Sequence, residues 1–398
     1  MQQSKPINIL YLAIHPIQNT KPYKLLISYK AISYCVCYLL KPEMVNVISE
    51  ENLNHPSFDT NVTSGYNNVF LNNHSPFSKA NTFWGLLSLD VIRAVKKANI
   101  LVVYGHNTAT FWLAMIYAKL LRKKIILTTD IAYLEANSKS SGWKLIIKPY
   151  VLRFLYNFWS DGVFVPSTST KIFLENTIKV NPSKIILTPY VVDEDLIVST
   201  IKNIDVGVFR KKSNIGGDPF VFIFCAKFID RKRPMDVLKA FVKICHNTNV
   251  FLIMIGDGPL KKELVDFTIS SNIQNKILFT GFVKYSTLPL YYASSNCLVF
   301  SSEHEPYGLP VNEAMLCGIP VIVSDKIGCR IDLVIEGKTG WVYETANVNE
   351  LSLKMANVAS LSYEELNSLK INCKNIMNKW SSEVNVENQI NYFKQIFA

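Results

Sequence analysis

Short apolar runs alternate with longer amphipathic segments along most of the 398-residue chain. Apolar runs without polar interruptions are typical of strands that are buried on both faces of a sheet. The segment between the second and third runs, 107–123, predicts a helix with Asn107 or Thr108 as its N-cap and a basic last turn. We predict strands over residues 7–14, 100–105, 124–129 and 162–167, and over 220–228, 250–256, 276–282, 297–302 and 320–325.

The order of strand, helix and strand repeats in both halves, which favours parallel sheets with helices on both faces. Residues 189–219 show weak periodicity, collect charges and include a Gly-Gly pair, so they indicate a connector. We predict two Rossmann-like domains facing across a cleft, over 1–195 and 196–378. Residues 379–398 predict an amphipathic helix, for which a return to the N-terminal domain is one open arrangement. Ligands of open α/β sheets bind at the carboxyl ends of the strands, so the cleft is the expected site.

The chain has a formal charge of +11 and a pI near 9.1, which indicates an anionic partner. The candidates are nucleic acid, a phosphorylated small molecule and an acidic membrane surface. The alternative is that the charge only reflects a basic, solvated exterior without a specific partner. The lysines and arginines are spread widely and form no recognisable nucleic-acid-reading motif. We therefore predict no nucleic-acid partner.

The cysteines and the N-terminus bear on the compartment. None of the eight cysteines forms a C-x-x-C pair, and most lie inside apolar runs, which suits buried thiols in a reducing cytosol. The first residues lack the apolar stretch of a signal peptide, and no uninterrupted apolar run approaches the roughly 20 residues that cross a bilayer. We expect a cytoplasmic protein, with contact to the inner face of the membrane left open.

One segment bears directly on membrane contact. Residues 141–159 mix Trp, Phe and Tyr with Lys and Arg, a composition that suits an amphipathic surface lying on an anionic bilayer. The same composition suits a domain helix that is kinked at Pro149 and packs its aromatic side chains inward. Both interpretations stay open from the sequence.

Two glutamates flank a predicted helix start in the stretch SSEHEPYGLPVNEAMLCGIPVIVSD. Pro310 fits the first helical position and Gly318 the position after the C-cap, which predicts a helix of about two turns over 309–317. The free N–H groups and the dipole at such a helix start favour an anion. Glu305, ahead of the helix, and Glu313, one turn inside it, suit hydrogen bonds from sugar hydroxyls instead. The combination predicts a ligand with both phosphates and hydroxyls, a nucleotide-sugar.

Two lysines follow the first strand of the second half, in AKFIDRKRPMDVLKAF. Lys227 ends the predicted strand, and Lys232 lies near the start of the next helix. Two ammonium groups on one side of the cleft would neutralise a diphosphate, most of all as it leaves with extra charge. The Gly-rich turn at 255–264 agrees with this, although such turns are common. Asp193 and Asp195 form an Asp-x-Asp pair in the connector, away from any strand end, so we predict no metal site.

These segments together resemble a known enzyme family. EPYGLPVNE resembles the E-x7-E motif of retaining glycosyltransferases of the GT-B fold. AKFIDRKRP, IGDGPLKKEL, the stretch from LFTGFVKY to PVIVSD, and EGKTGWVYE have the order and spacing of glycosyltransferase family 4 over roughly residues 220–345. The first half is similar more loosely, through ILYLAIHPIQ, VYGHNTA and VFVPSTSTKIFLEN. The resemblance implies a GT-B fold and a retaining hexosyltransferase-type enzyme of glycan or polysaccharide biosynthesis.

The resemblance also implies roles in catalysis for residues around the donor. Glu305 would contact hydroxyls of the donor sugar near the reacting carbon, and Glu313 would contact the ribose. Lys227 and Lys232 would hold the diphosphate, and His106, in YGHN, matches a histidine of the first domain that faces the donor sugar. No metal ion or separate cofactor is implied, and the donor substrate would be a UDP-sugar or a GDP-sugar.

Further positions are implied to line the donor pocket. Tyr307, Gly308 and Leu309 would supply backbone amides and shape around the sugar and the diphosphate, and Phe282 and Val283 would lie near the nucleobase. Each of the charged candidates also has an ordinary interpretation as a solvated loop or helix-end charge. His106 has an ordinary interpretation as a hydrogen-bonded core histidine.

The chain departs from the family pattern at three places. Lys227 stands where the family usually has Arg, which removes a bidentate contact. The first loop, HPIQNTKP, contains no glycine, and His15 and Gln18 are candidates for ligand contacts there. Cys329 replaces a common glycine at one edge of the donor pocket. An active enzyme would use a carbohydrate or lipid-linked acceptor, and the alternative is a catalytically inactive nucleotide-sugar-binding module of the same fold.

Overall fold

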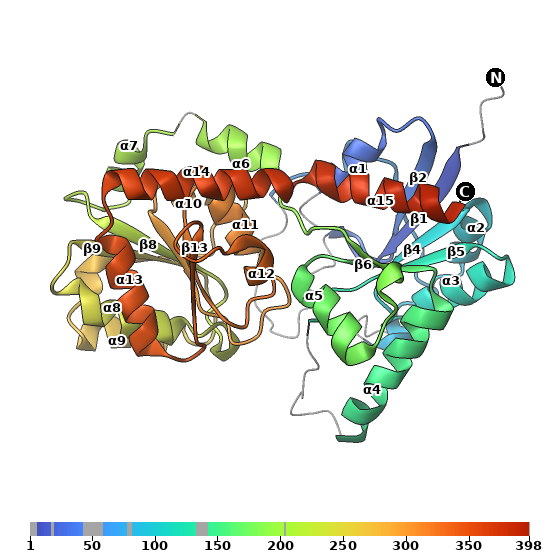
Figure 1. The fold of residues 1–398 in the computed structure, drawn as a ribbon, viewed down its shortest axis with the longest axis horizontal. Coiled ribbons are helices and arrows are strands. Elements are labelled where there is room, and N and C mark those ends of the chain that lie inside the picture. Colours follow the sequence, from blue (N-terminus) through green and yellow to red (C-terminus); the bar gives the residue numbers. More distant parts are fainter. Residues whose placement is uncertain are drawn as a thin grey trace. The chain divides into compact units, whose positions relative to one another are not determined.

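The computed structural model describes residues 6–16, 20–42, 59–77, 82–132, 142–202 and 204–397. The chain divides into two compact units, one made of Met1–Tyr190 with Ser382–Ala398 and the other of Val191–Ser381 (Figure 1). The division falls a few residues from the boundaries expected at 195 and 378. Helix α6 (Glu194–Ile201), which the expected boundary would cut, lies whole in the second unit.

A parallel sheet of seven strands forms the centre of the first unit, in the order β3-β2-β1-β4-β5-β6-β7. The predictions at 7–14, 100–105, 124–129 and 162–167 are confirmed as β1, β4, β5 and β6. Strands β2, β3 and β7 were not predicted. The strands span Ile7–Ala13 (β1), Ile32–Tyr38 (β2), Asn68–Phe70 (β3), Ile100–Tyr104 (β4), Lys124–Thr128 (β5), Gly162–Val165 (β6) and Ile185–Leu187 (β7).

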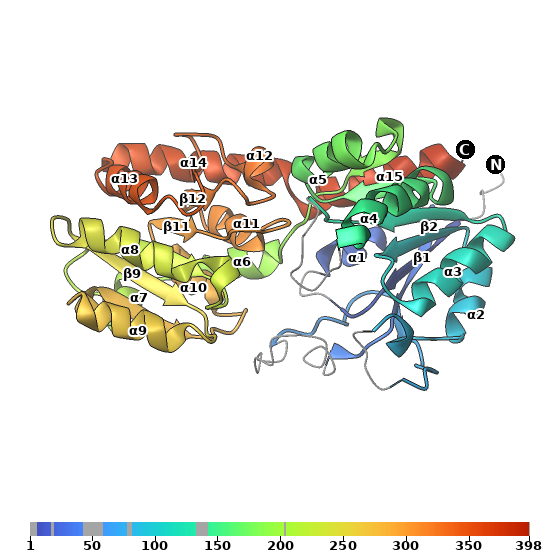
Figure 2. The same ribbon diagram turned by 90° about the horizontal axis from the view of Figure 1, so that it is seen from below.

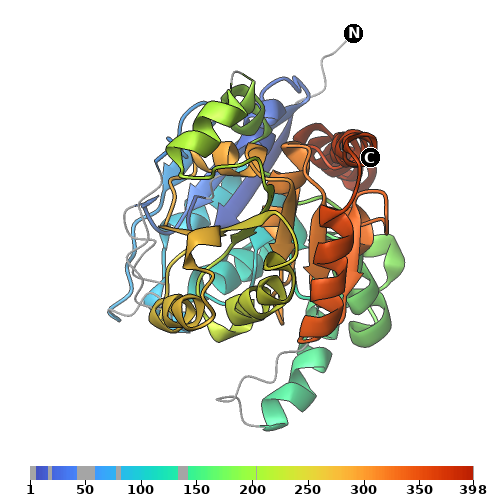
Figure 3. The ribbon, with the colours of Figure 1, turned by 90° about the vertical axis from the view of Figure 1, so that its left-hand side faces the viewer.

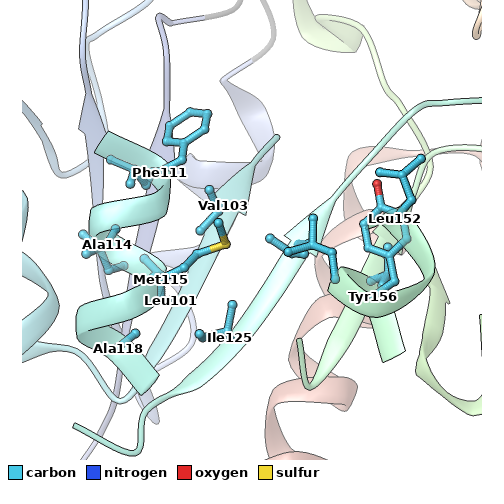
Figure 4. Packing of buried hydrophobic residues seen from close by; sticks show 14 of the residues in the cluster. Leu101, Val103, Phe111, Ala114, Met115, Ala118, Ile125, Leu152 and Tyr156 are labelled. Atoms are coloured by element: carbon cyan, nitrogen blue, oxygen red, sulfur yellow. The ribbon is translucent and has the colours of Figure 1, made fainter. Parts of the chain in front are cut away.

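Helix α3 (Ala109–Leu120) confirms the helix predicted after β4. Thr108 is its N-cap and accepts a hydrogen bond from the N–H of Phe111 at 3.3 Å. One face of α3 packs on β4 and β5 because its small and apolar residues recur at helical spacing (Figure 4). The packed side chains are Phe111, Ala114, Met115 and Ala118 of the helix and Leu101, Val103 and Ile125 of the strands.

Besides α3, four α-helices of the first unit lie before Tyr190 in the described residues. They are α1 (Lys21–Leu26), α2 (Asp90–Lys97), α4 (Gly142–Phe154), which contains Pro149 and continues into a π-helical turn η3 (Leu155–Trp159), and α5 (Thr168–Phe173). In the part of the chain that the structure describes, no helix combines the length and the apolar character that a membrane span needs.

The C-terminal helix α15 (Ser382–Phe397) belongs to the first unit. Its buried face contains Val386, Ile390 and Phe393, which join the core around β1 and β4. Polar side chains fix it as well, since Asn385 donates to the carbonyl oxygen of Pro189 at 2.7 Å. The chain thus leaves the first unit after Tyr190 and returns to it at its end.

The second unit contains a parallel sheet of six strands in the order β10-β9-β8-β11-β12-β13. The five strands predicted for the second half are confirmed, and β13 adds one that was not predicted. The strands span Phe220–Cys225 (β8), Val250–Ile255 (β9), Ile277–Gly281 (β10), Cys297–Phe300 (β11), Val321–Ser324 (β12) and Gly340–Tyr343 (β13).

Helices cover both faces of this second sheet (Figure 2). The chain steps in one direction from β8 to β10 and in the opposite direction from β11 to β13, so right-handed crossovers place the connecting helices on opposite faces. Helix α8 lies beside α9 and α13, and α11 lies beside α10 and α14. These helices span Pro234–Cys245 (α8), Lys261–Ser270 (α9), Leu288–Ala293 (α10), Leu309–Leu316 (α11), Val348–Ala359 (α13) and Tyr363–Lys379 (α14), with short α7 (Val206–Lys212) and α12 (Arg330–Leu333) beside them.

Candidate functional site

The strand order of the second sheet reverses between β8 and β11, which are paired neighbours. The loops that follow these two strands lead away in opposite directions and leave a gap for a ligand at the carboxyl edge. Residues 226–233 follow β8, and residues 301–308 follow β11. Both segments contain residues predicted for the site, so the fold places those residues at one topological switch point.

Two serines that were not among the predicted site residues hold the two loops together. Ser301 Oγ donates to the carbonyl oxygen of Lys232 at 2.9 Å, and Ser302 Oγ donates to that of Arg231 at 3.2 Å. The backbone N–H of Glu303 also donates to the carbonyl oxygen of Arg231, at 2.8 Å. Two serine hydroxyls and one backbone N–H of the loop after β11 therefore fix the backbone of the loop after β8.

This arrangement brings Lys232 and Glu305 into an ion pair. Both side chains are mostly buried, with exposed fractions of 13% and 16%. Burial lowers the pKa of Lys232, the Glu305 carboxylate opposes that change, and the positive charge of Lys227 adds to it. Lys227 and Lys232 therefore lie in one neighbourhood. The Lys232 ammonium also lies 5.3 Å from the centre of the Phe300 ring.

The Gly-rich turn after β9 supports the loop that contains Lys227. Gly256 and Gly258 have φ angles of +144° and +155°, and a Cβ at either position would collide with the backbone of Ala226 or Phe228. The N–H of Phe228 donates to the carbonyl oxygen of Asp257 at 2.9 Å. The two glycines thus permit a close approach of two backbones beside Lys227.

Helix α11 begins at Leu309, as predicted, but Pro310 is not its first residue. Gly308 is the N-cap, with φ of +109°, so Leu309 is the first helical residue and Pro310 the second. The placement of Pro310 at the first position was wrong because the left-handed conformation of Gly308 already turns the chain into the helix. Gly318 follows the C-cap with φ of +77°, as predicted. Pro310 has no N–H, and the N–H of Val311 donates to the carbonyl oxygen of Gly308 at 3.0 Å, which leaves the N–H of Leu309 outside the hydrogen bonds of the helix. Leu309 is 41% exposed there.

Tyr307 lies under this helix start and is 3% exposed. Its Oη accepts hydrogen bonds from Asn312 Nδ2 at 3.1 Å and from Trp380 Nε1 at 2.8 Å. Its carbonyl oxygen accepts from the N–H of Cys329 at 2.9 Å. The Tyr307 side chain therefore anchors the Gly308 turn from below, and Cys329, which replaces the common glycine, packs against the same turn.

Glu313 is 7% exposed on the inner side of α11. Tyr292 Oη donates to Glu313 Oε2 at 2.9 Å. Burial raises the pKa of Glu313 to about 7, and the bond from Tyr292 acts in the opposite direction. Burial raises the pKa of Cys225, at the end of β8; the charge of Glu313 adds to this change and the charge of Lys232 opposes it. Glu313 therefore lies near the cluster of Lys232 and Glu305 rather than on a separate surface.

Phe282 and Val283 follow β10, at the same carboxyl edge of the sheet, and both are half-buried. Burial raises the pKa of Tyr285, two residues further on, and the charge of Glu313 adds to this. The loop after β10 therefore reaches the neighbourhood of Glu313.

Asp193 of the Asp-x-Asp pair is the N-cap of α6 and accepts from the N–H of Leu196 at 3.0 Å.

A pocket of about 260 Å³ lies in the first unit, where the sheet order reverses between β1 and β4. His106 is among its residues, and burial lowers the pKa of His106, with the charge of Lys148 adding to the effect. The carbonyl oxygen of His106 accepts from Trp112 Nε1 at 2.9 Å. The pocket is lined by Ile14, Tyr104, Gly105, His106, Asn107, Thr128, Thr129, Asp130, Ile131 and Tyr190.

The first loop supplied two further candidates, His15 and Gln18. His15 Nδ1 pairs with the carbonyl oxygen of Pro16 at 2.8 Å, and His15 is not among the described lining residues. Gln18 lies outside the described residues. Asp130 and Tyr190 line the pocket, and neither belongs to a motif that the sequence analysis identified. A larger cavity, about 640 Å³ between β2, β3 and α2, contains none of the predicted site residues.

Two family models match the chain in succession. The model described as Glycosyltransferase Family 4 matches residues 54–196, and the model described as Glycosyl transferases group 1 matches residues 205–375. The second match contains the Lys232, Glu305 and Glu313 cluster, and the first contains His106.

Curated relatives agree in class. The chain is 29% identical over 184 residues to N-acetyl-alpha-D-glucosaminyl L-malate synthase of Bacillus anthracis, covering 46% of each chain. It is 31% identical to alpha-monoglucosyldiacylglycerol synthase of Acholeplasma laidlawii, covering 51% of this chain and 49% of the relative. It is 24% identical to UDP-Gal:alpha-D-GlcNAc-diphosphoundecaprenol alpha-1,3-galactosyltransferase of Escherichia coli, covering 78% of each. The alignments thus span about half the length of the first two relatives.

Solved structures show the same fold. A glycosyltransferase from Rickettsia africae ESF-5 superposes with a TM-score of 0.74 at 14% identity, covering 99% of both chains. HepE of Anabaena, solved in complex with UDP and glucose, superposes with a TM-score of 0.70 at 16% identity, covering 98% of this chain and 100% of HepE. With its two Rossmann-like sheets and both family matches, the chain belongs to the family 4-type glycosyltransferases of the GT-B fold.

Proposed function

We propose that the chain transfers a sugar from a nucleoside-diphosphate sugar to an acceptor hydroxyl with retention of the anomeric configuration. The Lys232–Glu305 ion pair, held at the strand-order reversal beside the start of α11, carries this proposal. A lysine suits the diphosphate and a carboxylate suits the sugar hydroxyls, so the pair presents both halves of the donor's chemistry. UDP in the HepE complex and UDP-Gal in the name of the E. coli relative favour uridine over guanosine.

Binding of the donor would change the Lys232–Glu305 ion pair. The diphosphate would draw Lys232 from Glu305, which frees the carboxylate for hydroxyls of the sugar. Lys227 adds a second positive charge, and the first amides of α11 add dipoles directed at the same anion. Glu313, whose pKa burial raises to about 7, would accept hydrogen bonds from the ribose hydroxyls.

The chemical step follows from these contacts. The bond between the anomeric carbon and the diphosphate oxygen breaks while the acceptor oxygen bonds to that carbon on the same face. The acceptor proton passes to the departing phosphate oxygen, so no protein nucleophile is required. Charge that develops on the leaving diphosphate is stabilised by Lys227, Lys232 and the helix amides. His106 would face the donor sugar from the first unit.

The acceptor would bind in the pocket around His106. Asp130 and Tyr190 line it and suit recognition of hydroxyl groups. The names of the Acholeplasma and E. coli relatives contain a diacylglycerol lipid and a diphosphoundecaprenol, which favours a lipid-linked carbohydrate or lipid acceptor and work at a membrane face.

The test begins with a thermal-shift screen of UDP- and GDP-sugars, in which the strongest stabiliser identifies the donor. Transfer with that donor is then followed by nucleotide release in wild type, Glu305→Gln and the control Glu303→Gln. Glu303 is two residues away and its side chain is 46% exposed, so the control should turn over normally. Glu305→Gln should bind the nucleotide, stay folded and lose transfer. Full turnover by Glu305→Gln would refute the assignment.

A nucleotide-sugar-binding module without catalysis is the second candidate. Lys227 in the place of the family's usual arginine and the glycine-free first loop favour it. Tight binding of a UDP-sugar without nucleotide release, in the presence of any lipid or carbohydrate acceptor, would select this candidate.

A further inference from the structure

We propose that the exposed apolar face of α4 docks on an anionic lipid bilayer and so brings a lipid-linked acceptor to the pocket that contains His106. The acceptor part rests on the proposed function. The docking part rests on the surface chemistry of α4 alone.

A continuous apolar stripe runs along one side of α4 and of η3, which follows it. Ile146, Tyr150, Phe154 and Phe158 recur every four residues and have exposed fractions of 69%, 69%, 55% and 73%. Phe154 and Phe158 stack with their ring centres 5.9 Å apart. Four large apolar side chains in line form a contiguous patch, which monomeric proteins rarely leave open to water without a use. We call these four residues the α4 stripe.

The opposite side of the same segment already serves the core. Leu152, Leu155 and Tyr156 are each 1% exposed and belong to the core cluster of the first unit (Figure 4). The α4 stripe is therefore not the face that folding uses. The N-terminal half of α4 also projects from the body of this unit (Figures 1 and 3), which leaves the stripe room to meet a flat surface.

The charges around the α4 stripe select an anionic bilayer as its occupant. Residues 142–159 include Lys144, Lys148 and Arg153 and contain no Asp or Glu. Arg153 is exposed beside Phe154, and Lys148, two residues from both Ile146 and Tyr150 in the sequence, is half-buried. Exposed aromatic and aliphatic side chains in a segment whose charged residues are all cations match the interface of an acidic membrane, where the apolar side chains enter the lipid and the cations meet phosphates.

The docking face is physically connected to the pocket in the first unit. The rings of Phe154 and Trp159 have their centres 6.3 Å apart, and those of Trp159 and Trp112 are also 6.3 Å apart. Trp112 in turn donates its Nε1–H to the carbonyl oxygen of His106 at 2.9 Å. The positive charge of Lys148 reaches His106 as well, since it contributes to lowering the pKa of that histidine. A lipid lying against α4 would therefore have its head group next to the pocket.

Co-sedimentation of the full chain with vesicles tests the docking without donor or turnover. Phosphatidylcholine vesicles are compared with vesicles that also contain phosphatidylglycerol. Wild type should bind the anionic vesicles and not the zwitterionic ones. The double variant Lys148→Gln, Arg153→Gln should bind the anionic vesicles about 25-fold more weakly, because each cation contributes roughly fivefold to the affinity. Tyr150→Ser with Phe158→Ser should weaken it at least about tenfold.

A matched control removes exposed apolar residues elsewhere. Ile27 on the first unit and Ile269 on the second are 61% and 59% exposed, so Ile27→Ser with Ile269→Ser should bind vesicles like wild type. All variants change surface side chains, and equal thermal unfolding midpoints verify that they are folded. Equal binding of wild type to both vesicle types, or unchanged binding of the Tyr150 and Phe158 variant, would overturn the proposal. So would a concentration-dependent dimer that this variant abolishes, because the face would then belong to a second copy.

Transfer measurements separate this proposal from the proposed function. With the Tyr150 and Phe158 variant, transfer to a short-chain acceptor in solution should equal that of wild type, whereas transfer to the same acceptor in vesicles should fall about tenfold or more. An equal fall with both acceptors would overturn the link between docking and acceptor delivery. Absence of transfer in every variant would count against the proposed function, and the vesicle binding would stand on its own result.

Discussion

Glu313→Gln removes a buried negative charge while it keeps the size of the side chain. The amide oxygen can still accept the hydrogen bond that Tyr292 donates to Glu313 Oε2 at 2.9 Å. The substitution therefore isolates the cost of ionising a carboxyl group inside the second unit, which makes it the sharpest test of the electrostatics of the site.

The magnitude follows from the change in pKa. Burial raises the pKa of Glu313 from an ordinary 4.5 to about 7, and one pH unit corresponds to about 1.4 kcal/mol. The native state keeps the proton where the unfolded chain releases it, so the contribution of Glu313 to stability is complete below about pH 4.5 and is lost as the pH rises through about 7. Relative to wild type, Glu313→Gln should thus gain about 3 kcal/mol at pH 8 and nothing near pH 4.

Urea unfolding of wild type and variant, compared at the same pH between 5 and 8, measures this gain. Comparison at equal pH cancels the titration of all other groups, and the exposed Glu303→Gln should show no pH-dependent difference. A gain of the same size at every pH, or a variant that is less stable at pH 8, would refute the reasoning that burial controls the ionisation of Glu313.

Three further substitutions probe the frame of the site. Gly308→Ala should cost about 1–3 kcal/mol of unfolding free energy, because φ is +109° and the new Cβ would lie 2.9 Å from a neighbouring side chain. Gly337→Ala, at φ +69° in open space, should cost less. An equal cost for the two substitutions would contradict the packing argument. Trp380→Phe removes the 2.8 Å hydrogen bond to Tyr307 and should lower stability by about 1 kcal/mol and raise the KM for the donor, whereas an unchanged KM would show that Tyr307 does not position the site. His106→Ala should reduce kcat on the order of 100-fold and leave nucleoside-diphosphate affinity in calorimetry unchanged, and a loss of nucleotide affinity would move His106 to a different role.

The strands that the sequence could predict are those buried on both faces. Ile100–Tyr104 and Val250–Ile255 are almost wholly buried, so their sequences are continuous apolar runs. Strand β2 (Ile32–Tyr38) was missed because its pattern alternates exposed Ser33 with buried residues and contains two cysteines. Strands β3 and β7 have three residues each, too few for a periodic signal.

The parts of the site carried by local motifs could be predicted, and the parts carried by distant contacts could not. Lys232 and Glu305 stand in recognisable segments, and the structure pairs them across 73 positions of sequence. Ser301, whose hydroxyl fixes the Lys232 backbone, and Trp380, which holds Tyr307, act over 69 and 73 positions and leave no local pattern. Pro310 is the second helical residue, not the first, because Gly308 adopts a left-handed backbone angle that spacing alone does not reveal.

The central claim is that Lys232 holds the diphosphate of a nucleotide-sugar, and calorimetric titration with UDP and with UMP tests it most directly. Wild type should bind UDP at least about tenfold more tightly than UMP, since a hydrogen bond to a charged group contributes about 1.5–3 kcal/mol. In Lys232→Met this ratio should fall towards one, while Lys239→Met, at an exposed position of α8, should keep it. The same ratio in Lys232→Met as in wild type would contradict the account.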